Sequence, residues 1–123
     1  ITSTPKIIFI NYKVSKKIDE TIKVDLINKI IAEGSLKMND QKENNNDNNF
    51  TCTQIDKNLL PIDSLYISNP LIKNIEFITP SGLLDKKRIE LDSTEFSIRM
   101  QLNSRTKFIT LKMRNLTLSK IIL

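Results

Sequence analysis

The sequence predicts a mainly all-β fold with little helix, and three observations support that prediction. Isoleucine occurs 20 times and leucine 14 times in 123 residues, whereas alanine occurs once. β-Branched side chains favour strands, while alanine is the residue that most favours helices. Apolar and polar residues also alternate through much of the last third of the chain, which is the period of a half-buried strand. The length is typical of one domain, so we expect residues 1–123 to fold as a single unit.

The first part of the chain is expected to form two strands. Residues 7–14 are apolar on both faces at first and then alternate, which predicts a strand that is buried early and half exposed later. Residues 22–38 carry apolar side chains mainly at even positions, so we expect one long strand kept in phase, with Gly34 at a bulge or sharp bend. A helix over residues 19–33, capped by Asp19 and ended by Gly34, is the alternative.

The middle of the chain is expected to hold a loop followed by short strands. Residues 39–49 are polar and Asn-rich, cannot bury apolar surface, and are therefore predicted to form a flexible loop. Short strands are predicted at residues 50–55, 65–67 and 75–78. The apolar residues 59–61 are expected to close one end of the core. Residues 79–82, Thr-Pro-Ser-Gly, predict a turn, because proline fixes φ and glycine permits a positive φ.

The last third of the chain has the clearest strand pattern. Residues 88–92 alternate, and residues 94–102 alternate without a break. Residues 107–118 alternate again, with a change of phase near residues 114–115 that predicts a bulge. Residues 103–105 have the composition of a turn, so the strands on either side of it are expected to pair as a hairpin.

Six to eight strands separated by turns are typical of a small barrel or sandwich. A long bent strand with a glycine near its bend, followed by antiparallel hairpins, favours a single Greek-key β-barrel of the oligonucleotide/oligosaccharide-binding (OB) type. An immunoglobulin-like sandwich and a pleckstrin-like barrel are the alternatives.

The composition excludes most kinds of catalytic site. The chain has no histidine, no tryptophan and one cysteine, which excludes His- or Cys-paired zinc sites, Ser-His-Asp triads and disulfide frameworks. No carboxylates pair as a general acid and base, and two glycines cannot form a phosphate-binding loop. Cys52 is expected to be a small buried hydrophobe. We therefore expect no enzyme activity, metal, cofactor or small-molecule substrate. No stretch suggests a membrane span or a secretion signal.

The charge distribution favours binding to a polyanion. Residues 1–85 carry 10 basic and 11 acidic groups, whereas residues 86–123 carry 9 basic and 3 acidic groups. Lysine and arginine displace the counterions of phosphates, although a solvated basic face is the alternative. An OB barrel binds single strands with cations and aromatic rings. The candidate nucleic-acid-binding residues are Arg99, Arg105, Lys107, Lys112, Arg114, Tyr12 and Tyr66, with Phe108 as a further aromatic candidate. Because few aromatic residues are present, we expect weak binding by the isolated chain.

Apolar residues in excess of a small core predict a partner interface. Residues 7 and 9 flank a strand whose other face is also apolar, residue 109 departs from the alternation of its strand, and residues 121–123 are all apolar. The candidate interface residues are Ile7, Phe9, Ile109, Ile121, Ile122 and Leu123. Closure of an ordinary core by these side chains is the alternative.

Four segments occur in an order that resembles a known family. Residues 6–11 read Lys-Ile-Ile-Phe-Ile-Asn, and residues 34–40 read Gly-Ser-Leu-Lys-Met-Asn-Asp. Residues 50–52, Phe-Thr-Cys, and residues 64–67, Ser-Leu-Tyr-Ile, come after the Asn-rich stretch. This order resembles the Ten family, the smallest OB-fold subunit of the CST (Cdc/Ctc–Stn–Ten) telomere-capping complex. The resemblance covers residues 6–67.

The resemblance implies a single OB barrel that forms a heterodimer with a larger OB-fold telomere protein, the Stn subunit. It implies a non-enzymatic role in the nucleus, at the chromosome telomere, where the pair binds and protects the single-stranded G-rich end and regulates telomere length. The family usually ends in a helix that docks on its partner, and no clear helix follows Leu118 in this sequence. A protein-only adaptor, which completes a larger partner without contacting nucleic acid, is the alternative function.

Overall fold

The structure is a computed structural model that describes residues 4–37 and 49–123. Within these residues the chain forms nine strands and no helix. The strands are β1 (Lys6–Lys16), β2 (Ile22–Glu33), β3 (Phe50–Asp56), β4 (Pro61–Ile67), β5 (Ile72–Ile78), β6 (Leu84–Glu90), β7 (Ser93–Leu102), β8 (Thr106–Met113) and β9 (Leu116–Ile122). The all-β prediction is confirmed, and the helix considered for residues 19–33 is excluded because β2 occupies most of them. The loop expected at residues 39–49 lies, apart from Asn49, outside the described residues.

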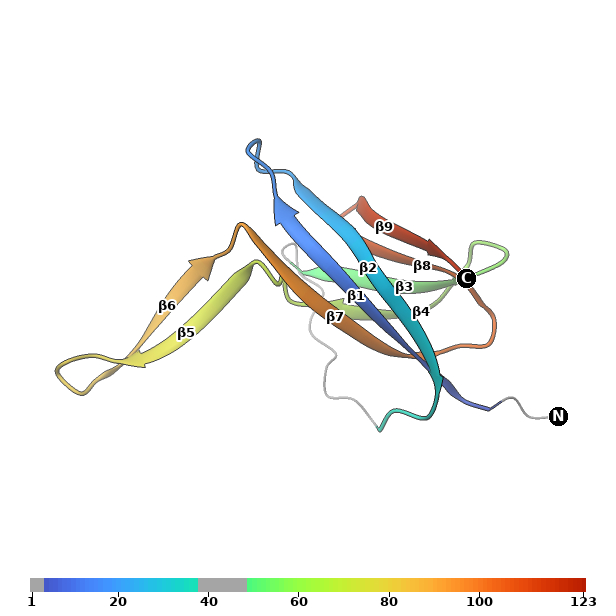
Figure 1. The fold of residues 1–123 in the computed structure, drawn as a ribbon, viewed down its shortest axis with the longest axis horizontal. Helices are drawn as coiled ribbons and strands as arrows, with labels where there is room; N and C mark the ends of the chain where they lie inside the picture. Colours follow the sequence, from blue (N-terminus) through green and yellow to red (C-terminus); the bar gives the residue numbers. More distant parts are fainter. Residues whose placement is uncertain (1–3, 38–48) are drawn as a thin grey trace.

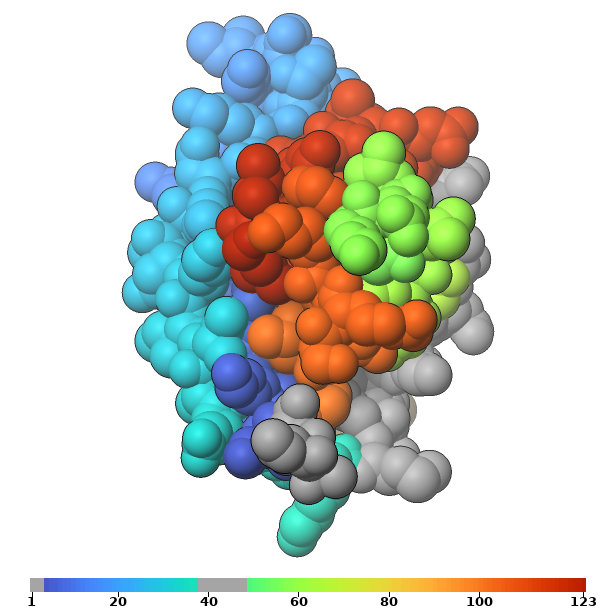
Figure 2. Space-filling model, turned by 90° about the vertical axis from the view of Figure 1, so that its right-hand side faces the viewer, coloured from blue at the N-terminus to red at the C-terminus, as the bar shows by residue number. Residues whose placement is uncertain are grey.

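The strands form three antiparallel sheets. The β1 sheet has the order β2-β1-β7, the β3 sheet has the order β4-β3-β8-β9, and β5 pairs with β6 alone. Figure 1 shows the β1 sheet lying across the β3 sheet, with the β5–β6 hairpin, here called the arm, projecting to one side. In Figure 2 the atoms of β2 form one side of the molecule, beside those of β8 and β9. This arrangement fits a barrel-like OB-type fold, although no ladder among the described residues joins the two larger sheets into a closed barrel.

The hydrophobic core lies between the β1 sheet and the β3 sheet. The fully buried residues of β1 alternate along the strand: Ile8, Ile10, Tyr12 and Val14. Phe96 of β7 packs between two other rings, with centroids 5.4 Å from Tyr12 and 5.9 Å from Phe50. Full burial of a large apolar side chain contributes about 1.5–3 kcal/mol, so this alternation is what holds β1 at the centre of its sheet.

A bulge changes the phase of β2, contrary to the prediction of one strand in phase. Tyr12 is opposite Leu26, whereas the preceding Asn11 is opposite Asn28, so Ile27 is an extra residue in β2. The Asn11 side-chain amide donates to Asn28 Oδ1 at 2.6 Å, which supports the shifted register. Even-numbered residues before the bulge, and odd-numbered residues after it, therefore share a face with the core residues of β1. Gly34 is not the bulge, because it lies just beyond the end of β2.

Two further predictions about the last third of the chain are wrong. Strands β7 and β8 do not form a hairpin, because β7 pairs with β1 while β8 pairs with β3. Residues 103–105 therefore carry the chain from one sheet to the other. The phase change near residues 114–115 is a turn rather than a bulge: Arg114 has a φ of 56°, and β8 and β9 pair across it. Leu59 and Leu60, expected to close the core, are instead exposed in the turn between β3 and β4.

Candidate nucleic-acid interface on the β3 sheet

The strand register places one row of polar and aromatic residues on the outside of the β3 sheet. Cys52 and Leu111 are opposite each other and fully buried, so their side chains point into the core. The neighbouring pair, Thr51 and Lys112, therefore points outward, because successive side chains of a strand alternate. Tyr66 of β4 is opposite Thr51, so Tyr66, Thr51 and Lys112 form a row across three strands.

Two more rows lie beside this one. The second row contains Ser64, Thr53, Thr110 and Lys120, and the third contains Ile55, Phe108 and Ile122. The Lys120 Nζ atom lies 4.7 Å from the centroid of the Phe108 ring, which is a cation–π contact. The hydroxyl oxygens of Thr53 and Ser64 are 3.0 Å apart, within hydrogen-bonding distance. We call these three rows, together with Thr117 opposite Lys112, the Tyr66 face.

The Tyr66 face is cationic and carries no acidic side chain. Lys112 and Lys120 are exposed, while the rings of Tyr66 and Phe108 are each half-buried. Neighbouring strands are about 4.8 Å apart, so Tyr66 and Lys112 lie roughly 10 Å from each other across the sheet. The rings, the ammonium groups and the hydroxyl groups of Thr51, Thr53, Ser64 and Thr117 can contact bases and phosphates of a single strand, whereas the Thr110 hydroxyl is buried.

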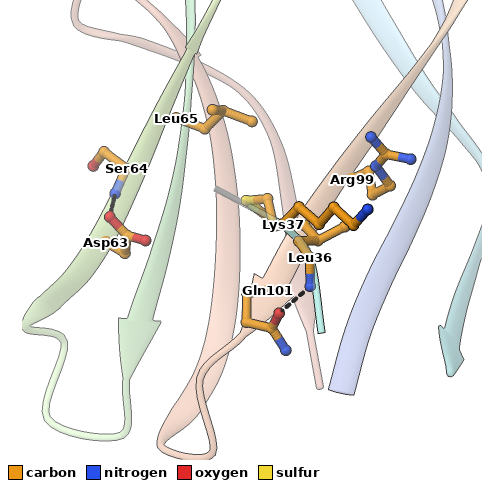
Figure 3. Close-up of a pocket in the computed structure, with 8 residues that line it drawn as sticks. Leu36, Lys37, Asp63, Ser64, Leu65, Arg99 and Gln101 are labelled. Atoms are coloured by element: carbon orange, nitrogen blue, oxygen red, sulfur yellow. Dashed lines mark hydrogen bonds between the residues drawn. The ribbon is translucent and has the colours of Figure 1, made fainter. Parts of the chain in front are cut away.

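A cavity of about 230 Å³ borders this face, between β4 and β7. It is lined by Leu36, Lys37, Asp63, Ser64, Leu65, Arg99, Met100 and Gln101 (Figure 3). Ser64 belongs to both the Tyr66 face and the cavity, which makes the two continuous at β4. The backbone N–H of Leu36 donates to Gln101 Oε1 at 2.8 Å, so the segment after β2 is held beside β7. Lys37 and Arg99 supply two cations to this cavity, against the single carboxylate of Asp63.

The structure brings some of the predicted nucleic-acid-binding residues together and separates others. Tyr66 and Lys112 share one row of the Tyr66 face. Arg99 is opposite Phe9 in the β1 sheet and reaches this region only through the cavity beside β4. Of the remaining predicted cations, Arg105 lies in the β7–β8 turn, Lys107 lies at the start of β8, and Arg114 lies in the turn between β8 and β9.

Tyr12 was predicted to contact nucleic acid, and the structure shows that this prediction is wrong. Its side chain is fully buried and packs against Phe96, so neither face of the ring is open to a base. Burial raises the pKa of Tyr12 to about 12, with Ser119 beside its hydroxyl opposing part of the shift. Burial likewise raises the pKa of the Cys52 thiol to about 12, so this residue is an unreactive part of the core.

Three of the six predicted interface residues are buried within the chain instead. Ile109 and Ile121 belong to the core cluster, while Ile7 lies on the outer face of β1, where its side chain is next to Gly34. Phe9 and Leu123 are half-buried, and Ile122 is 65% exposed. Only these last three residues remain accessible to a partner.

Sequence reasoning missed two features of this surface. Lys120 was not singled out as a site residue, although its contact with Phe108 makes it part of the Tyr66 face. The separate pairing of β5 with β6 in the arm was also missed, although a strand at residues 75–78, a turn at residues 79–82 and alternation at residues 88–92 were all predicted. Among the described residues, no three His, Cys, Asp or Glu side chains cluster closely enough to hold a metal ion. No helix suited to crossing a membrane occurs in the described ranges.

Comparison of this chain with protein-family models, with curated proteins and with solved structures finds no match.

Proposed function

We propose that this chain is a non-enzymatic subunit that binds single-stranded nucleic acid through the Tyr66 face. The observation that carries the proposal is a sheet face with two lysines, two aromatic rings and a band of hydroxyl groups, and with no carboxylate. Most protein surfaces mix both signs of charge, so the absence of carboxylates across three rows favours a polyanion. The residues that carry this function are Tyr66, Phe108, Lys112 and Lys120.

The proposed contacts follow from the chemistry of a single strand. Bases stack on the exposed sides of Tyr66 and Phe108, and phosphates approach the two lysines. Stacking on Phe108 requires that the Lys120 ammonium group leave the ring, which it covers at 4.7 Å. Only two rings are present on the face, so the isolated chain is expected to bind weakly and a partner to supply most of the affinity.

The resemblance to the Ten family supports a more specific form of the proposal. In that form the chain is a nuclear telomere-capping subunit that pairs with the larger Stn subunit, and the pair protects the single-stranded G-rich end and limits its extension. A protein-only adaptor is the second candidate function. The half-buried Phe9 and the exposed Ile30 are opposite each other on the outside of the β1 sheet, and this apolar pair favours a protein contact there.

Charge reversal on the Tyr66 face tests the proposal. The variant Lys112→Glu/Lys120→Glu is compared with Lys13→Glu/Lys17→Glu, which makes the same change of net charge on or beside the β1 sheet. Binding of a fluorescent G-rich single strand is measured by anisotropy at several salt concentrations. We expect the Tyr66-face variant to lose at least about tenfold in affinity. The slope of the logarithm of its binding constant against the logarithm of the salt concentration should also become shallower by about 1.4, because each of the two lost phosphate contacts contributes about 0.7 for a single strand.

Equal weakening of the two variants would show that only the overall charge matters and would end the nucleic-acid proposal. Co-expression with a larger OB-fold partner separates the two candidate functions. If the partner forms a one-to-one complex that lacks salt-sensitive binding to single strands, the adaptor is the correct function. A G-rich strand bound more tightly than its duplex by the complex supports the telomeric form.

A further inference from the structure

The arm is a two-stranded ribbon that has almost no cover from the other described residues. At its base the backbone N–H of Leu91 donates to the carbonyl of Leu71 at 2.7 Å, and the Leu71 side chain is buried in the core. Beyond that base, residues 73–78 and 80–88 are all exposed. Figure 1 shows the arm projecting away from the two larger sheets. An isolated two-stranded hairpin is only marginally stable in water, so an arm of this kind gains stability from a further strand.

The arm carries large apolar side chains in the open. Their exposed fractions are 44% for Ile75, 41% for Phe77, 73% for Ile78, 68% for Leu83 and 67% for Leu84. Three of the five lie on β5 and one on β6. The apolar surface is therefore concentrated along β5 and at the tip.

The two edges of the arm differ in how they are protected against pairing. Strand β6 contains three consecutive cations, Lys86, Lys87 and Arg88, and charged residues of this kind block the addition of a strand. Strand β5 contains only Lys73 and Glu76 as charged residues. The unpaired edge of β5 is thus the open one, while an antiparallel β6–β6 pair would oppose like charges.

We propose that two copies of this chain pair through β5, antiparallel and with Ile75 on the two-fold axis. A two-fold axis perpendicular to the shared sheet keeps each side chain on its own face. A residue of one copy then lies opposite a residue of the other copy whose number differs from its own by zero or by an even number. The paired arms form one four-stranded sheet in the order β6-β5-β5-β6.

This register makes β5 complementary to itself. Ile75 lies opposite Ile75, Ile72 opposite Ile78, Asn74 opposite Glu76, and Lys73 opposite Phe77 of the second copy. The pairs combine apolar contact, an amide that donates to a carboxylate, and an ammonium group beside an aromatic ring. No two like charges face each other.

The neighbouring registers are worse for identifiable reasons. With Asn74 on the axis, Ile72 lies opposite the Glu76 carboxylate. With Glu76 on the axis, two carboxylates lie opposite each other, which is destabilising. The complementarity of the Ile75 register is what favours a second copy over an unrelated strand, and it does not depend on the Tyr66 face.

Sedimentation equilibrium over a range of concentrations tests the proposal. We expect the mass to rise from 14.2 kDa towards twice that value as concentration increases. The variant Ile75→Lys places two ammonium groups across the axis and is expected to remain at the monomer mass. Leu83→Lys, an equal change at an exposed residue of the turn, should still dimerise. A native chain that stays monomeric throughout, or a dimer that Ile75→Lys leaves intact, overturns the proposal.

Disulfide formation tests the register directly. Directly opposite residues of an antiparallel pair have Cα atoms about 4.5–5.5 Å apart, within the range that a disulfide spans. Cys52 is buried, so an introduced cysteine is the only accessible thiol. We expect Ile75→Cys to form a cross-linked dimer under mild oxidation, and Lys87→Cys, opposite Ile75 within the arm, to do so at least tenfold more slowly. Equal rates for the two variants contradict pairing through β5.

Discussion

Gln54 of β3 donates its side-chain amide to the backbone carbonyl of Gln101 on β7, at 3.0 Å, and thereby joins the two larger sheets. Its carbonyl oxygen accepts from the Asn103 N–H at 2.9 Å and from the Thr106 hydroxyl at 2.7 Å. The Gln54 side chain is 1% exposed, so water cannot replace these bonds. One buried amide therefore holds the connection at which the chain crosses from the β1 sheet to the β3 sheet.

Gln54→Leu is expected to lower the free energy of unfolding by about 3 kcal/mol. The substitution keeps most of the volume but removes three hydrogen bonds, each of which contributes about 0.5–1.5 kcal/mol. Urea denaturation measures the change. Thr53→Val, at the next residue, removes only the hydroxyl contact with Ser64 outside the core and should cost under about 1 kcal/mol. A Gln54→Leu variant as stable as Thr53→Val would show that the amide does not hold the sheets together.

The strands could be predicted from the sequence, but their pairing could not. Alternation is a local property, and it predicted strands close to the observed β1, β3 and β7. Pairing depends on residues far apart in the chain, such as Ile10 with Ile98. A local pattern also cannot distinguish a bulge from a turn. This is why the change of phase at residues 114–115 was interpreted as a bulge, and why β2 was expected to stay in phase.

The candidate site was predictable only in part, for a related reason. Lys112 was found from the alternation of its strand and Tyr66 from its polar neighbours, but the residues beside them on the Tyr66 face follow from the order of β4, β3 and β8. Tyr12 had a usable signal, since it shares the parity of Ile8 and Ile10, the apolar side of its own strand. Tyr12 was instead selected because its neighbours in the sequence, Asn11 and Lys13, are polar.

Ile109→Ala and Ile122→Ala are expected to have very different effects, although both residues were predicted to meet a partner. Ile109 is fully buried, whereas Ile122 is 65% exposed. The first substitution leaves a cavity and should cost about 2–5 kcal/mol of unfolding free energy, and the second should cost less than about 0.5 kcal/mol. Thermal and urea unfolding monitored by circular dichroism measure both. Similar losses for the two variants would place Ile109 outside the core.

Stability is expected to fall as the pH rises above about 9. The pKa of Cys52 is raised from 9.0 to about 12 and that of Tyr12 from 10.0 to about 12. Below pH 9 both groups are protonated in the folded and unfolded states, so they do not affect the pH dependence. Above their ordinary pKa values only the unfolded chain releases the protons, which favours unfolding by about 1.4 kcal/mol per pH unit for each group.

Cys52→Ala isolates the contribution of the thiol. Tyr12 contributes little below pH 10, so between pH 9 and 10 the thiol dominates the slope. Urea denaturation at closely spaced pH values should show that the free energy of unfolding of Cys52→Ala hardly changes in this interval. That free energy should be lower than for the parent at every pH, because the substitution makes a buried side chain smaller. A parent and a variant with equal slopes would mean that the folded thiol ionises as readily as the unfolded one.

Gly34→Ala is expected to destabilise the protein through a contact that a second substitution relieves. Gly34 has a φ of 154°, which L-residues rarely adopt, and a Cβ atom there would lie 3.1 Å from Ile7 Cδ1. The backbone strain and the close contact together should lower the free energy of unfolding by about 1–3 kcal/mol. Ile7→Val removes the Cδ1 atom, so the double variant should lose less stability than the sum of the single variants, by about 0.5 kcal/mol or more. Strict additivity would assign the whole cost to the backbone and leave the 3.1 Å contact without effect.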